Sequence, residues 1–121
     1  MVKLESLKKS YQFKKTLKEK KVHSDFFSIF ATKNFYKPKC KSNLLISFVM
    51  KKKIGNAVKR NKIRRKLKAI VQKLLKKRGA ISKDYTYIVF GKSNAYTQKQ
   101  IVLMPLMKKS FNKIKDKWLI Y

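Results

Sequence analysis

Residues 51–68 read KKKIGNAVKRNKIRRKLK, a glycine–asparagine turn that leads directly into a basic helix. Three of the chain's four arginines, Arg60, Arg64 and Arg65, lie in this segment, whereas nearly all other positive charge is lysine. Arginine presents a planar fork of donors that matches phosphate groups and base edges, which a lysine ammonium does not. We therefore expect the main functional surface of the protein here.

The spacing of apolar residues predicts a helix from Asn56, a suitable N-cap, to about Arg78, with Gly79 following its last turn. At about 100° per residue, one side of this helix gathers apolar residues, as in a helix packed on a core: Ile63, Leu67, Ile70, Val71 and Leu74. The opposite side forms a polar ridge of Asn61, Arg65, Lys68, Gln72 and Lys76, with Lys62, Lys66 and Lys73 along one edge. The sequence thus predicts a helix with one buried and one cationic side.

The rest of the sequence predicts three strands and two further helices. Mixed apolar and lysine residues over 7–21, without glycine or proline, indicate a basic amphipathic helix. Residues 24–31, 44–50 and 85–90 are short, apolar and rich in aromatic or β-branched residues, as expected of strands, and residues 32–36 either continue the first of these strands or belong to the following loop. The last element shows helical spacing of Leu103, Met107, Phe111, Ile114 and Trp118, with Pro105 in its first turn. Because a strand precedes and follows the central helix, a β-α-β unit in one small domain is predicted.

The charge composition points to a polyanionic partner. The 121 residues carry 34 Lys and Arg against five Asp and Glu, a formal net charge of +29. No carboxylate occurs between Asp25 and Asp84, so the middle of the chain cannot neutralise itself. The 44% hydrophobic content still allows a modest core, which separates the chain from disordered basic tails.

An active site carried by the protein itself is not expected. Its five acids are scattered, His23 is the single histidine and Cys40 the single cysteine, which is too little for a metal site or a nucleophile with its base. The three glycines are isolated, so there is no glycine-rich phosphate loop. No apolar run has signal-peptide or membrane-spanning length, and a lone cysteine favours a reducing compartment. We expect a soluble, cytoplasmic protein without a membrane partner.

Residues 52–65, KKIGNAVKRNKIRR, closely resemble the RNR motif of the protein subunit of bacterial ribonuclease P. The order of the other predicted elements is similar to that family as well. The resemblance implies an α/β (α+β sandwich) fold like that of a ribosomal-protein domain, with a mostly antiparallel central sheet, about three helices and an unusual left-handed β-α-β crossover. It also implies a single domain over 1–121, with tails at about 1–6 and 116–121.

The same resemblance implies a function without a protein active site. In that family the RNA subunit carries the Mg²⁺-dependent endonucleolytic chemistry that removes the 5′ leader of precursor tRNA, and the protein binds both RNAs. The residues that match RNA-subunit contacts are Lys52, Lys53, Asn56, Arg60, Asn61, Lys62, Arg64, Arg65 and Lys68. Those that match the leader-binding cleft are Phe13, Leu17 and Phe30, although an aromatic residue is usual at the position of Leu17. The implied partners are ribonuclease P RNA and precursor tRNA, with no cofactor on the protein.

Two other classes of protein share part of this pattern. A ribosomal or other structural RNA-binding protein would have the same charge and small core, but not the contiguous signature. A DNA-binding module would place a recognition helix in a major groove, yet here the basic helix is followed by a strand and no dimerisation element is evident. For Phe13 and Phe30 the alternative role is ordinary core packing. The sequence leaves the oligomeric state open.

Overall fold

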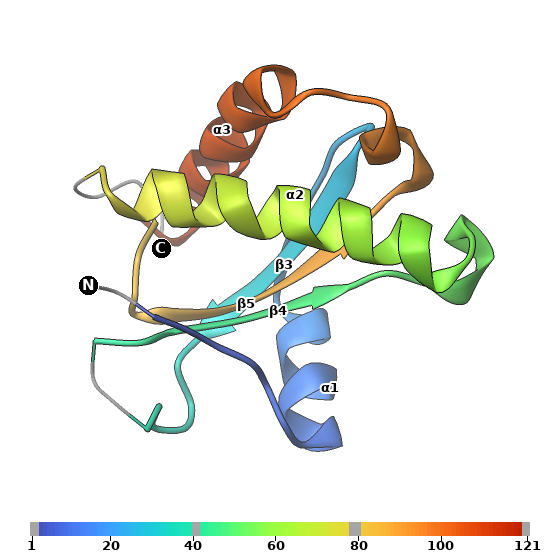
Figure 1. Cartoon of the computed structure of the whole chain (residues 1–121). Helices are drawn as coiled ribbons and strands as arrows, with labels where there is room; N and C mark the ends of the chain where they lie inside the picture. Colours follow the sequence, from blue (N-terminus) through green and yellow to red (C-terminus); the bar gives the residue numbers. More distant parts are fainter. Residues whose placement is uncertain (1–2, 40–41, 78–80, 120–121) are drawn as a thin grey trace.

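The computed structural model describes residues 3–39, 42–77 and 81–119 and shows one α/β domain (Figure 1). These residues form five strands, three α-helices and two short 3₁₀ helices. In chain order these are β1 (Leu4–Glu5), α1 (Ser10–Lys18), β2 (Lys20–His23), β3 (Phe27–Lys33), β4 (Leu44–Val49), η1 (Lys52–Ile54), α2 (Ala57–Leu75), β5 (Tyr85–Gly91), η2 (Ser93–Tyr96) and α3 (Gln100–Leu119).

The five strands form one sheet in the order β1-β4-β5-β3-β2. β1 pairs with β4 and β4 with β5 in parallel, whereas β3 pairs with β5 and with β2 in antiparallel fashion. The sheet is therefore mixed, not mostly antiparallel. β4, α2 and β5 form the predicted β-α-β unit. In Figure 1 α2 lies in front of the sheet, β4 runs to the right, and β5 lies above β4. The crossover from β4 through α2 to β5 is therefore left-handed, whereas almost all such crossovers are right-handed.

Alternation along the strands divides the sheet into two faces. Phe27, Ile29 and Ala31 of β3 point into the main core, together with Tyr87 and Val89 of β5. α2 and α3 cover this face, and the predicted apolar stripe of α2 is completely buried in it. The four described residues of the predicted α3 stripe, Leu103 to Ile114, are buried too, whereas the side chain of Trp118 lies outside the described part.

The opposite face of the sheet carries α1, which lies on the far side of the sheet from α2 (Figure 1). The side of this helix that packs on the sheet is polar. α1 buries the polar residues Gln12 and Thr16, while Tyr11 and Leu17 are 54% and 37% exposed. Gln12 is buried because its Oε1 accepts hydrogen bonds from the backbone N–H groups of Lys8 and Lys9 and so caps the helix. Tyr11 and Leu17 of α1 therefore border open space.

Several element boundaries differ from the sequence prediction. The first helix covers only nine residues of the expected 7–21, because Lys20–His23 forms the edge strand β2. The strand expected over 24–31 is shifted to Phe27–Lys33. The expected N-terminal tail contributes β1, and α3 continues through 116–119 of the expected C-terminal tail. Arg78 and Gly79, the predicted end of the central helix, lie outside the described residues.

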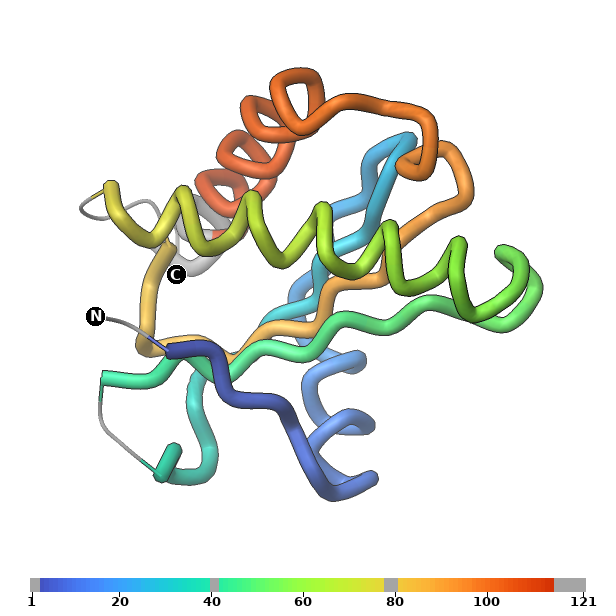
Figure 2. Tube along the Cα trace, in the orientation of Figure 1, coloured from blue at the N-terminus to red at the C-terminus, as the bar shows by residue number. Residues whose placement is uncertain are grey.

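β5 and α2 approach each other closely at Gly91, the last residue of β5. A Cβ atom at this position would overlap the Met50 sulfur and lie 2.8 Å from Cγ2 of Ile63. The trace in Figure 2 shows β5 running between β3 and β4 beneath α2. Only glycine allows the helix to sit this close to the strand.

Candidate nucleic-acid interface

The basic segment is built around the start of α2. η1 ends at Ile54, and Gly55 follows with φ +152°, a conformation that favours glycine. Asn56 is the N-cap of α2, as predicted, since its Oδ1 accepts a hydrogen bond of 3.0 Å from the backbone N–H of Lys59. The turn thus directs the lysines of η1 and the first turns of α2 outward from one corner of the sheet.

Seven of the nine side chains predicted to contact an RNA subunit are exposed: Lys52, Lys53, Asn56, Asn61, Lys62, Arg65 and Lys68. Arg60 and Arg64 are half-buried. Arg64 donates a hydrogen bond of 2.7 Å from Nη1 to Oδ1 of Asn61, which fixes its guanidinium on the helix surface. The Nε atom of Arg60 is buried and has no hydrogen-bond partner within the described residues. All five residues of the predicted ridge, Asn61, Arg65, Lys68, Gln72 and Lys76, are exposed, so this side of α2 presents its cations to solvent.

Not every cation of α2 belongs to this surface. The ammonium group of Lys66 donates hydrogen bonds to the carbonyl oxygens of Ala95, Tyr96 and Gln98, at 2.9, 2.9 and 2.5 Å. Burial and the nearby charge of Lys62 lower the pKa of Lys66. The sequence prediction placed Lys66 beside the polar ridge, but its hydrogen bonds anchor η2 and the following turn to α2. Its role is structural.

Tyr96 of η2 is a residue that the sequence prediction did not single out. The ammonium groups of Lys59 and Lys62 lie 5.2 and 4.8 Å from the centre of its ring. Lys59 also donates a hydrogen bond of 2.9 Å to Oγ of Ser93. These contacts orient two lysines of the first turns of α2, and no spacing in the sequence could have indicated them because the partners are more than thirty residues apart.

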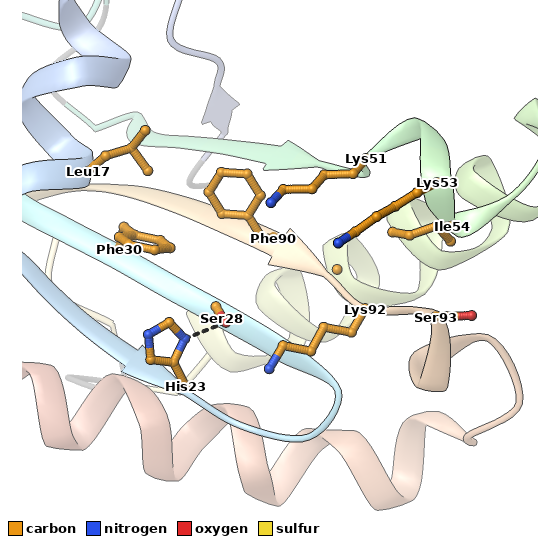
Figure 3. A pocket seen from close by; sticks show the side chains of 11 residues that line it. Leu17, His23, Ser28, Phe30, Lys51, Lys53, Ile54, Phe90, Lys92 and Ser93 are labelled. Atoms are coloured by element: carbon orange, nitrogen blue, oxygen red, sulfur yellow. Dashed lines mark hydrogen bonds between the residues drawn. The ribbon is translucent and has the colours of Figure 1, made fainter.

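A cleft lies next to this surface, on the sheet face that carries α1 (Figure 3). Its volume is about 670 Å³ and its lining is mainly apolar and cationic: Leu17, His23, Ser28, Phe30, Lys51, Lys53, Ile54, Phe90, Gly91, Lys92 and Ser93. The rings of Phe30 and Phe90 meet edge to face with centroids 5.4 Å apart. His23 contacts Phe30 in the same way at 5.9 Å, and its Nδ1 lies 2.7 Å from Oγ of Ser28. The cleft is an aromatic floor with lysines at its rim.

The structure brings together two of the three residues predicted for a cleft. Phe30 and Leu17 line it, whereas Phe13, half-buried on α1, is not among the lining residues. The sequence prediction missed Phe90 and His23, which reach the floor because β5 and β2 flank β3 in the sheet. Strand order is the missing information, since the alternation of each strand alone does not show which rings share a face.

The described residues contain no cluster of three or more histidine, cysteine, aspartate or glutamate side chains that could hold a metal ion. No helix in that part of the chain has the length and apolar character needed to cross a bilayer. Fold and site therefore define a class: a small basic α/β protein with a left-handed crossover helix, whose cationic surface adjoins an open aromatic cleft.

Comparison with known proteins places the chain within this class. The family model described as Ribonuclease P matches residues 1–115. The Ribonuclease P protein component of Mycoplasma capricolum subsp. capricolum is 30% identical over 109 residues, which is 90% of this chain and 94% of that protein. The corresponding component of Mycoplasma mycoides subsp. mycoides SC is 35% identical over 83 residues, 69% of this chain and 72% of that protein. The chain belongs to the ribonuclease P protein family.

Solved structures support the same fold. An RNase P protein mutant from Staphylococcus aureus superposes with a TM-score of 0.72 at 21% identity, covering 91% of this chain and 87% of that one. The RNase P protein from Thermotoga maritima gives a TM-score of 0.65 at 23% identity, covering 87% of this chain and 96% of that one. The small α/β fold that the resemblance implied is thereby confirmed, with a mixed sheet in place of a mostly antiparallel one.

Proposed function

We propose that this chain is the protein subunit of a ribonuclease P holoenzyme and assists removal of the 5′ leader from precursor tRNA. The α2 surface would bind the RNA subunit, and the aromatic cleft would bind the single-stranded leader. The observation that carries the proposal is the junction between these two regions. Lys53 belongs to the RNR motif and also lines the cleft, so that one RNA complex can engage both regions at once.

The α2 surface suits a folded RNA through its phosphates. Its exposed lysines and the exposed Arg65 are accompanied by no acid between Asp25 and Asp84. Each phosphate that such a surface neutralises releases counterions, which gives tight, salt-dependent binding with little sequence information. Arg65, exposed near the middle of α2, can in addition present its fork to one phosphate in two hydrogen bonds.

The cleft suits a single strand because bases are only free to stack when they are unpaired. Phe30 and Phe90 offer aromatic surface, and each base stacked on such a ring contributes about 1–3 kcal/mol to binding. Lys51 and Lys92 at the cleft can neutralise the backbone of that strand. A double-stranded region would not reach the ring faces. The cleft therefore favours the leader over the body of the tRNA.

The hydrolytic chemistry in this proposal belongs to the RNA subunit, with Mg²⁺ supplied there. The residues of the cleft would bind and orient the leader. His23 and Ser28 form a close pair in the cleft, but no third group within the described residues orients the histidine as a base. Purified protein should accordingly leave precursor tRNA intact.

Reconstitution with a bacterial ribonuclease P RNA tests the proposal. The protein alone should cleave nothing, and its addition should lower both the Mg²⁺ requirement and the KM for precursor tRNA. Cleavage by the protein without RNA, or no effect on either quantity, would refute the assignment.

Two substitutions should separate the two surfaces. Arg65→Ala should weaken assembly with the RNA subunit, whereas Phe30→Ala should reduce the preference for precursor over mature tRNA. Lys109→Ala, which removes an exposed charge on α3, serves as the control for charge loss. If both substitutions lowered assembly and precursor preference in parallel, the division between α2 and the cleft would be wrong.

A further inference from the structure

A second aromatic cluster lies on the flank of α1 that faces away from the cleft. The rings of Tyr11 and Phe35 meet with centroids 6.3 Å apart, and Phe35 contacts Tyr36 at 5.0 Å. Gln12 and Thr16 point toward the sheet, so at about 100° per residue Tyr11 emerges on one side of α1 and Leu17, which lines the cleft, on the other. The two aromatic regions therefore occupy opposite flanks of one helix.

This cluster is open to solvent. Tyr11 is 54% exposed, far more than expected of a ring whose task is to fasten α1 to the sheet. This part of the chain is already packed against the sheet through the buried residues Leu7, Gln12 and Thr16. The exposed tyrosine thus stands without a packing role that would explain it.

Cations and a small pocket accompany these rings. The ammonium group of Lys15 lies 4.8 Å from the centre of the Phe35 ring. Next to it is a pocket of about 270 Å³, lined by Lys15, Glu19, Thr32, Lys33, Asn34 and Phe35. Asn34 is held by hydrogen bonds with Lys83 and Thr86. The pocket therefore combines a fixed wall, an aromatic side and two lysines.

The two regions approach each other at the C-terminal end of α1. Leu17 lines the cleft and Glu19 lines the second pocket, and two residues of chain span at most about 7 Å. Because β2 begins at Lys20, directly after α1, a strand leaving the cleft would cross the solvent side of the last turn of α1 to reach the second pocket.

We propose that the Tyr11–Phe35 flank is a second subsite for single-stranded RNA, which takes a leader nucleotide further from the cleavage site than those in the cleft. This inference rests on the proposed function. Tyr11 supplies the stacking surface for the base, and Lys15 and Lys33 neutralise the adjoining phosphate. Glu19 repels phosphate but accepts hydrogen bonds from exocyclic amino groups, so the base and not the backbone faces it.

The test compares two precursor tRNAs in the reconstituted holoenzyme. One has a short leader that ends within the cleft, and the other extends it by about four nucleotides, the smaller end of single-strand site sizes. Tyr11→Ala should weaken binding of the long-leader substrate about fivefold, the lower limit for one stacked base, and leave the short-leader substrate within about twofold. Tyr11→Phe, which keeps the ring, should bind both like the unmodified protein.

Lys15→Gln provides a second variant that does not depend on the tyrosine. It should reduce the salt dependence of binding for the long leader only. Equal losses for both leaders, or none for the long one, would overturn the second subsite. If the unmodified protein failed to prefer precursor over mature tRNA with either leader, the proposed function itself would fall, which is a different result.

Discussion

Lys66→Met should destabilise the fold, although the residue lies in the most basic helix of a strongly cationic protein. Its ammonium group bonds to the carbonyl oxygens of Ala95, Tyr96 and Gln98. A hydrogen bond to a charged group contributes about 1.5–3 kcal/mol, and three bonds from one partly solvated ammonium are not additive. We therefore expect a loss of about 2–4 kcal/mol, less than the sum of the three bonds.

Urea unfolding followed by circular dichroism measures this loss, and Lys68→Met is the matched control. Lys68 lies two residues further along α2 and is exposed, so its substitution should change the free energy of unfolding by less than about 0.5 kcal/mol. In RNA binding the order of the two variants should be reversed. Lys68→Met should reduce the affinity for RNA and the salt dependence of binding more than Lys66→Met does. If Lys66→Met unfolded at the same urea concentration as Lys68→Met, the anchoring role of Lys66 would be refuted.

Three further outcomes are expected. Gly91→Ala should cost about 1–3 kcal/mol in urea unfolding, because the new methyl group would crowd Ile63. Asn56→Ala should lose about 1 kcal/mol of stability with the N-cap, whereas Asn56→Asp should keep the cap and weaken RNA binding. Burial raises the pKa of Tyr36 to about 12 and also raises that of Tyr87. Tyrosine in the unfolded chain ionises near pH 10. The free energy of unfolding should therefore be constant below that pH and fall between pH 10 and 12, where the unfolded chain loses protons that the folded protein keeps, and urea unfolding across that range measures the fall.

The central helix could be predicted in detail because its sequence and its environment agree. Ile63, Leu67 and Leu74 repeat at helical spacing, and each of them is buried. Asn56 follows a glycine and caps the helix, as its position predicts. Local pattern suffices where one face of a long helix meets the core and the other meets solvent.

The first helix shows where pattern fails. Its sequence predicts an amphipathic helix, but the residues that it buries are the polar Gln12 and Thr16, whose hydrogen bonds are satisfied locally, while Tyr11 and Leu17 are exposed. Apolar residues that border an open cleft look the same in sequence as those that enter a core.

The cleft and the second strand required tertiary information. β2 contains three charged or polar residues out of four and has no strand signal of its own. Its place beside β3 comes from backbone pairing. Once it is placed, His23 joins Phe30 and Phe90 on one face, an arrangement that no single segment encodes.

The position of β5 has a consequence for folding during synthesis. β5 is flanked by β3 on one side and β4 on the other, and it is the last of the five strands in the chain. Until residues 85–91 have left the ribosome, β3 and β4 lack the strand that joins them, and α2 lacks part of the surface on which it packs. The basic signature is by then already exposed beside an anionic ribosome. Native pairing over such long sequence separations is slow. The lysines of α2 have no nearby acid in the sequence to neutralise them, so anions that screen their charge should accelerate completion of the sheet.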